Sequence, residues 1–83
     1  MSAKILQATV TTADVEALPL VEIAERLIYS EPELNLVCER MITAAQRILN
    51  RNLHTEDAWP QAERDLSAEQ RLAVWLEAIS SIS

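Results

Sequence analysis

The sequence predicts an all-α fold, a small bundle of three main helices plus a short connecting helix. Glycine is absent from all 83 residues, which disfavours tight β-hairpins because their turns rely on glycine at positive φ. Apolar residues recur at three- and four-residue steps over three long stretches. Proline or capping-box residues stand where each stretch begins. We therefore expect the main helices near residues 19–29, 31–52 and 67–81.

Residues 1–11 are expected to be separate from a single helical domain that comprises residues 12–83. The segment MSAKILQATVT has one charged residue and no helical stripe. It is either a flexible arm that becomes ordered on a partner or a short extended segment, whose apolar residues would be Ile5, Leu6, Ala8 and Val10. The residues after it predict a short helical turn, capped by Thr11 or Thr12.

The first main helix is expected to begin at Pro19, because the missing N–H of proline costs nothing at the first helical position. One face of this helix is apolar and consists of Leu20, Ile23, Ala24, Leu27 and Ile28. Glutamate and arginine side chains point away from that face, so the helix is amphipathic.

The second helix is the longest and is expected to form the centre of the core. Ser30 and Glu33 have the spacing of a capping box, and Pro32 is tolerated in the first turn. Its apolar face is broad and comprises Leu34, Val37, Cys38, Met41, Ile42, Ala45, Ile48, Leu49 and Asn52. In a chain without glycine C-caps, such a helix must end at Asn, Ser or a proline boundary.

The last helix is expected to begin after Ser67, which forms a second capping-box pattern with Gln70. Its apolar face contains Leu72, Trp75, Leu76, Ile79 and Ile82. Residues 53–66 must turn the chain between the two long helices, and they include the predicted short helix near residues 58–65.

Composition restricts the function classes. The formal net charge is −6, so phosphate backbones repel the chain and we expect no nucleic-acid partner. A lone cysteine excludes a disulfide within the chain, and no apolar run approaches the roughly 20 residues needed to cross a bilayer. We expect a soluble, cytoplasmic protein without a membrane partner. A chain this short buries only about 60% of its unfolded surface, and small proteins often gain stability from a metal or a partner subunit.

A nucleophile–base pair would have to use Cys38 and His54. If both lie on or just past one helix, their 16-residue separation at 1.5 Å per residue puts them roughly 24 Å apart. A working pair requires about 3 Å. Cys38 also falls on the apolar side of the helix, where cysteine behaves as a small hydrophobe, so we interpret it as a buried structural residue.

A remote alternative is a metal-binding protein or enzyme that uses His54, Glu56 and Asp57. Their residue types suit metals or proton transfer, but no HxxxH or CxxC spacing supports a metal site. Helix ends explain the same residues, since a cation is favoured near a helix C-terminus and Asp57 can cap the next helix. We therefore predict no metal, no cofactor and no catalytic residue.

The strongest interaction candidate is a stripe of arginines on the central helix. At 100° per residue, Arg40, Arg47 and Arg51 fall within about 40° of one line, with Leu36 and Ala44 on or beside it. The stripe lies roughly 120° from the centre of the apolar face. Arginine is enriched at interfaces because its guanidinium pairs with carboxylates, so these residues are candidates for binding a partner or a second copy.

The arginines have an alternative interpretation, and one tryptophan is a further candidate for binding a partner. The arginines are either interface residues or a solvated flank paired within the fold to Glu33 or Glu39. Trp59 lies in the connection between helices and is the tryptophan expected to stay partly exposed, so it is added to the partner-binding candidates.

Residues 18–53, LPLVEIAERLIYSEPELNLVCERMITAAQRILNRNL, resemble the small helical connector (adaptor) proteins that join tailed-phage heads to tails. The matching positions are Leu20, Glu22, Leu27, Ile28, Glu31, Glu33, Ile42, Ala44, Ala45 and Arg51. The tail SAEQRLAVWLEAI resembles the final helix of those proteins. The chain departs from many of them in having only about fourteen residues between its last two main helices, where they carry a strand-forming insertion.

The resemblance implies a subunit of an oligomeric assembly. We thus predict a non-catalytic protein–protein interaction or assembly protein, which binds a protein partner or itself. The alternative is a small acidic regulator that binds and inhibits one target protein, as phage-encoded inhibitors and antitoxins do. Mass in solution separates the two, because a ring-former gives higher oligomers and an inhibitor a monomer or dimer.

Overall fold

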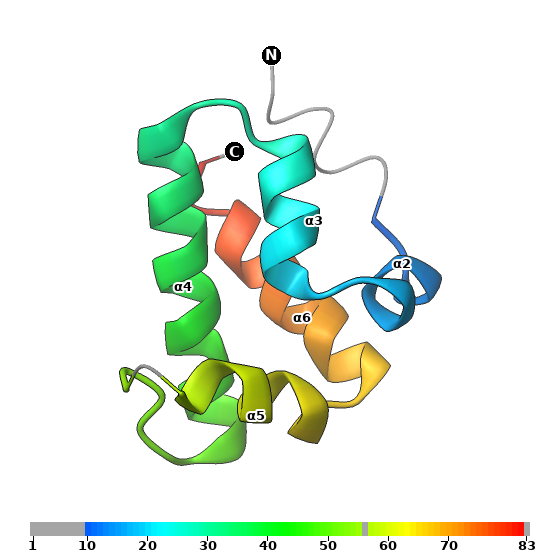
Figure 1. The fold of residues 1–83 in the computed structure, drawn as a ribbon, viewed down its shortest axis with the longest axis vertical. Helices are drawn as coiled ribbons and strands as arrows, with labels where there is room; N and C mark the ends of the chain where they lie inside the picture. The colour runs from blue at the N-terminus through cyan, green and yellow to red at the C-terminus, as the bar shows by residue number, and fades with distance from the viewer. Residues whose placement is uncertain (1–9, 56, 83) are drawn as a thin grey trace.

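A computed structural model of the chain describes residues 10–55 and 57–82. The described part is all-α, with no strand, which confirms the predicted fold class. Its helices are α2 (Thr12–Ala17), α3 (Leu20–Leu27), α4 (Glu31–Leu49), α5 (Ala58–Asp65) and α6 (Ala68–Ile79). In Figure 1, α4 runs along one side, α6 passes behind α3, and α5 lies across the lower end. The extended segment predicted around Ile5, Leu6 and Ala8 lies outside the described residues.

Two of the predicted N-terminal caps form. The Thr11 N–H donates to Asp14 Oδ2 at 2.8 Å, and the Thr11 side chain accepts from the Asp14 N–H. At α6 the Ser67 N–H donates to Gln70 Oε1 at 2.9 Å, while the Gln70 N–H donates to Ser67 Oγ at 3.1 Å. Each capping box satisfies amide groups that the helix itself leaves free, so these two helices begin where the sequence places them.

Two other expected caps are wrong in detail. Pro19 is the N-cap of α3 rather than its first residue, because its ψ of 146° keeps it outside the helix. Ser30 is the N-cap of α4, but its side chain makes no capping hydrogen bond. Ser30 is exposed, so water can meet the amide groups of the first turn, and Pro32 removes one of those donors.

The end of α4 is set by Asn50. This residue adopts the left-handed conformation, with φ 56° and ψ 46°, and its N–H donates to the Gln46 carbonyl at 2.8 Å. Asparagine is among the few residues other than glycine that tolerate this conformation, so it replaces the missing glycine C-cap. The helix therefore ends at Leu49, earlier than the predicted residue 52, and Asn52 lies in the following turn. α3 likewise stops at Leu27, short of residue 29.

The core is formed mainly where α4 packs on α6, with α2 and α3 closing the other sides. Trp75 and Met41 are among the largest completely buried side chains. The buried hydrophobic residues are Val15, Leu20, Ile23, Ala24, Ile28, Val37, Met41, Ala44, Ala45, Leu53, Ala62, Leu66, Val74, Trp75, Ala78 and Ile79. The alanines of α4 and α6 allow the two helix axes to come close, since interaxial distance depends on the side chains at the contact.

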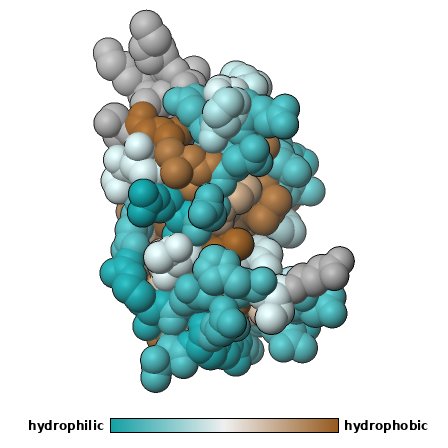
Figure 2. Space-filling view, turned by 90° about the vertical axis from the view of Figure 1, so that its left-hand side faces the viewer, coloured by the Kyte–Doolittle hydropathy of each residue, from teal (hydrophilic) through white to brown (hydrophobic). Residues whose placement is uncertain are grey.

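The buried face of α4 is turned relative to the predicted one. Ala44, expected on the arginine side, is only 2% exposed, whereas Ile48, expected in the core, is 39% exposed. Leu34, Cys38 and Ile42 are half-buried at the margin of the core. Figure 2, which looks onto the α4 side, shows hydrophobic residues in its upper part above a mainly hydrophilic lower part. α6 covers the α4 face nearer to the arginines, so the stripe lies along the edge of the α4–α6 contact.

Among the described residues, no helix is both long and apolar enough to cross a membrane.

Candidate protein-interaction surface

The arginine stripe remains on the surface of the folded chain. Arg40 and Arg47 are exposed on α4, and Arg51 is exposed just beyond its end. Leu36, the apolar residue predicted beside them, is half-buried. The three arginines thus stay at the surface, on α4 and just beyond its end, whereas Ala44 is buried in the core.

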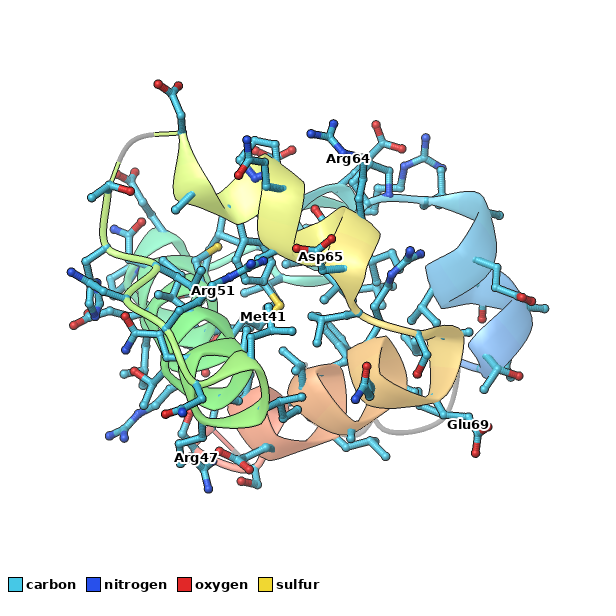
Figure 3. The ribbon with its side chains drawn as sticks, turned by 90° about the horizontal axis from the view of Figure 1, so that it is seen from below. Met41, Arg47, Arg51, Arg64, Asp65 and Glu69 are labelled. Carbon is cyan, nitrogen blue, oxygen red and sulfur yellow. The ribbon has the colours of Figure 1, made fainter. Side chains whose placement is uncertain are left out.

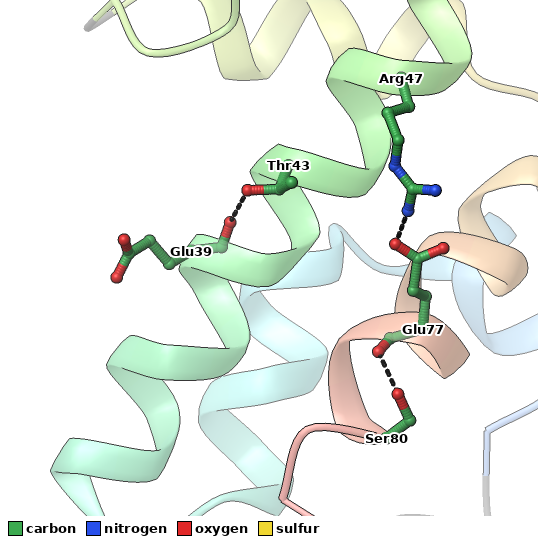
Figure 4. A network of polar contacts seen from close by, with 5 residues as sticks. All are labelled: Glu39, Thr43, Arg47, Glu77 and Ser80. Atoms are coloured by element: carbon green, nitrogen blue, oxygen red, sulfur yellow. Dashed lines mark hydrogen bonds and ion pairs between the residues drawn. The ribbon is translucent and has the colours of Figure 1, made fainter.

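Two of the three arginines are paired within the fold. Arg47 forms an ion pair with Glu77 of α6, and Arg51 forms one with Asp65 of α5, as Figures 3 and 4 show. Pairing inside the fold was one of the two predicted possibilities, but the partners are Glu77 and Asp65 rather than Glu33 or Glu39. The pairs are exposed, with Arg47 and Glu77 side chains 63% and 50% accessible, so each contributes only about 0–1 kcal/mol.

Arg40 differs from the other two. Its guanidinium makes no hydrogen bond or ion pair with any residue in the described ranges, and the side chain is exposed. The Thr43 hydroxyl donates to the backbone carbonyl of the neighbouring Glu39 at 3.2 Å, within α4 (Figure 4). The carboxylate of Glu39 therefore stays in solvent. Arg40 is therefore the member of the stripe that is free to meet an external carboxylate.

Exposed apolar residues adjoin the Arg47–Glu77 pair in the sequence. Ile48 follows Arg47 and is 39% exposed, and Leu76 precedes Glu77 and is 48% exposed. Because the ion pair brings α4 and α6 together at this point, these four residues belong to one region of the surface. With Arg40 they make up what we call the α4–α6 surface.

Trp59 is half-buried on α5 and packs against the core. Its indole Nε1 is buried without a hydrogen-bond partner among the described residues, as is that of Trp75. The ring edge that carries the N–H thus faces inward, so any contact of Trp59 with a partner would use its carbon atoms. Because it is half-buried, the main role of Trp59 is to pack α5 against the core.

Two residues of the metal alternative, His54 and Asp57, lie in the described part of the chain, and neither belongs to a metal-binding group there. His54 and Asp57 are both exposed, and the His54 N–H donates to Asn52 Oδ1 at 3.0 Å. Asp57 is the N-cap of α5, as predicted, but its side chain makes no capping hydrogen bond. Glu56 lies outside the described residues. Within residues 10–55 and 57–82, no group of three His, Cys, Asp or Glu side chains is placed to hold a metal ion.

Cys38 is half-buried rather than buried as predicted. Burial raises the pKa of its thiol, and the negative charge of Glu25 on α3 raises the pKa further. Because the thiolate is the nucleophilic form, this environment makes Cys38 less reactive at neutral pH. The residue thus behaves as a packing group at the α3–α4 contact.

A polar junction between four helices is a feature that the sequence analysis missed. The Leu20 N–H at the start of α3 donates to Glu63 Oε2 on α5 at 2.8 Å. From α6, Arg71 Nε donates to the Glu63 carbonyl at 2.9 Å, and its Nη1 donates to the Val15 carbonyl of α2 at 3.0 Å. These half-buried bonds join segments that are 43 and 56 residues apart in the sequence.

One signal in the sequence could have revealed Arg71. It precedes Val74 by three residues and Trp75 by four, so helical geometry puts it on the buried side of α6. A charged residue on an apolar face needs partners, because burial without them is costly. The identity of those partners depends on the tertiary fold and could not be read from the sequence.

A hollow of about 340 Å³ opens beside this junction. Its walls are formed by Glu16, Ala17, Leu18, Pro19, Pro60, Glu63, Arg64 and Arg71. A second hollow, of about 210 Å³, lies between α2 and α3 and has mainly apolar walls.

Comparison of the chain with protein-family models, with curated proteins and with solved structures gave no significant match.

Proposed function

We propose that the chain is a non-catalytic protein–protein interaction protein, a subunit of an oligomeric assembly of the head–tail connector type. The α4–α6 surface is its contact region. Residues 18–53, over which the chain resembles the connector proteins, contain α3 and α4 and supply the α4 side of that surface.

The observation that supports this proposal is the combination of exposed apolar and paired charged residues at the α4–α6 edge. Leu76 is about half exposed beside an ion pair whose two members are themselves exposed. A surface pair of this kind stabilises the monomer little, so its members can exchange partners when a second protein approaches. Arg40 adds a guanidinium that has no partner among the described residues, and arginine with apolar neighbours is characteristic of interface cores.

The test is the mass of the purified chain in solution, by size-exclusion chromatography with light scattering. We expect an oligomer that dissociates when Arg40 and Arg47 are both replaced by Glu, and also when Leu76 is replaced by Ser. Arg26→Glu is the matched control, because Arg26 also forms an exposed ion pair, with Glu22 at 3.4 Å, but on α3. An oligomer of unchanged mass in the α4–α6 variants, with unchanged helicity, would contradict the proposal.

A second candidate is the small acidic regulator, and Tyr29 favours it. Tyr29 is 83% exposed in the α3–α4 connection, the most exposed of the large hydrophobic side chains in the described residues. Glu25 and Glu31 lie close to it in the sequence and are exposed. An exposed tyrosine among acids suits the basic surface of one target protein. A monomeric mass, together with loss of target binding in Tyr29→Ala, would support this function over the first.

A further inference from the structure

We propose that the hollow between α2, α5 and α6 is a binding site for a single carboxylate attached to a short apolar group. Arg71 and Arg64 bind the carboxylate, and the apolar walls of the hollow receive the attached group. The site is separate from the α4–α6 surface and does not depend on the proposed assembly function.

The position of the Arg71 guanidinium is fixed by the fold. Guanidinium has five N–H donors, of which the Nε donor and one Nη1 donor are used by the carbonyls of Glu63 and Val15. Three donors remain, and the whole Nη2 group has no partner among the described residues. Because two helices already hold the side chain, a ligand would bind without the entropy cost of ordering it.

The charge of Arg71 is not neutralised by its contacts. Carbonyl oxygens are neutral acceptors, whereas Arg26, Arg47 and Arg51 each pair with a carboxylate. Arg71 is therefore a half-buried cation in the wall of a hollow with free donors. Arg64, which is exposed and has no hydrogen bond or ion pair with any described residue, brings a second guanidinium to the same wall. Figure 3 shows Arg64 on a different side of α5 from Asp65, which faces Arg51.

The two glutamates of the lining refine the choice of ligand. Glu63 accepts the Leu20 N–H through Oε2, so its carboxylate is directed to the positive amino end of α3. Glu16 is exposed and has no ion pair in the described part of the chain. Its negative charge disfavours a ligand with two carboxylates, because the second would lie near a like charge. A single carboxylate matches the two arginines best.

The remaining walls determine the rest of the ligand. Ala17, Leu18, Pro19 and Pro60, whose side chains are apolar, also line the hollow. A volume of about 340 Å³ is at the lower end of the range of small-molecule sites, which is about 300–1,000 Å³. The hollow therefore accommodates a branched aliphatic group of a few carbons. Such a carboxylate is present both in free short-chain acids and at the C-terminus of a peptide that ends in an aliphatic residue.

The experiment uses isovalerate and isovaleramide, two probes of the same shape of which only the first is charged. Each is titrated into the labelled full chain at constant ionic strength, and backbone amide and arginine Nε–H resonances are followed by NMR. We expect saturable shifts at Arg71 Nε–H and Leu20 N–H, with a Kd on the order of millimolar for isovalerate. Isovaleramide should bind at least about tenfold more weakly, because its neutral amide cannot form an ion pair, or the two parallel bonds of a carboxylate, with a guanidinium.

Variants identify the residues that bind. Arg64→Gln should weaken isovalerate binding about three- to tenfold without altering the fold, since the exposed Arg64 side chain makes no hydrogen bond or ion pair with the described residues. Arg26→Gln removes the same charge elsewhere and should leave Kd unchanged. Equal binding of the two probes, equal effects of the two variants, or shifts that do not saturate would overturn the proposal.

A comparison of two peptides distinguishes a free short-chain acid from a peptide C-terminus as the source of the carboxylate. Acetyl-Ala-Ala-Leu with a free C-terminus is compared with the same peptide as its amide. Tighter binding of the free-acid peptide than of isovalerate assigns the site to the C-terminus of a protein partner, and weaker binding assigns it to a free short-chain acid. The Arg40, Arg47 and Leu76 variants of the α4–α6 surface should leave all these affinities unchanged, so the two proposals fail independently.

Discussion

Replacing Arg71 by methionine tests the polar junction, because methionine keeps most of the side-chain length and removes every donor. The carbonyls of Val15 and Glu63 then lose their partners. A hydrogen bond from a charged group contributes about 1.5–3 kcal/mol, so two of them contribute about 3–6 kcal/mol in a dry interior. The junction is half-buried and water can replace part of each bond, which lowers the expected loss to about 2–4 kcal/mol.

This loss is large for a chain of 83 residues, whose whole free energy of unfolding should be about 4–12 kcal/mol. Urea denaturation followed by circular dichroism measures it, and hydrogen exchange should show that the α2 amides lose protection first. Arg71→Lys keeps the charge but reaches one carbonyl at a time, so it should lose about half as much.

Arg26→Met is the control, because it removes an exposed pair within one helix, worth about 0.3–0.5 kcal/mol. If Arg71→Met is no more destabilising than this control, the junction contributes nothing to stability and the argument for a rigidly held guanidinium is refuted.

Three more predictions concern other parts of the fold. Met41→Ala should lower the free energy of unfolding in urea by about 2–5 kcal/mol, because a completely buried side chain leaves a cavity; a loss below about 1 kcal/mol would contradict the assigned packing. Asn50→Ala should cost about 1 kcal/mol while Asn50→Gly is neutral or stabilising, since only glycine improves on asparagine at positive φ; equal effects in thermal unfolding would argue against the left-handed cap. The raised pKa of Cys38 means that the folded state favours the protonated thiol. The stability that the protonated thiol contributes is therefore complete below the unfolded pKa of about 8.5 and falls as pH rises through the folded pKa. Native protein should react more slowly with iodoacetamide at pH 8 than urea-unfolded protein, and Cys38→Ala should abolish the added loss of stability at high pH.

The local features of the fold could be predicted from the sequence because they depend on residues close together in the chain. The capping boxes at Thr11 and Ser67 each need two residues three positions apart, and both form. Asn50 ends α4 for a reason that the absence of glycine already implies. The predicted end of this helix, residue 52, was wrong, because periodicity alone does not indicate which asparagine adopts the left-handed conformation.

The packing of α4 could not be predicted to the same accuracy. Periodicity locates the average apolar direction, but the buried arc also depends on which neighbouring helix comes closest. α4 packs chiefly on α6, Ala44 is buried in the core, and the more apolar Ile48 stays partly exposed. The partners of Arg47 and Arg51 follow from the same arrangement, since Glu77 and Asp65 are brought near them only by tertiary folding.

The junction around Arg71 also has a consequence for the order in which the chain can fold during synthesis. α2 and α3 are made first, but α2 packs chiefly on α6, and the amino end of α3 takes its cap from Glu63 on α5. Helices of six and eight residues are too short to persist alone in water. The N-terminal third of the domain therefore cannot form stable helices until the ribosome has added α5 and α6. A nascent chain stopped before Arg71 should remain sensitive to protease at residues 12–27.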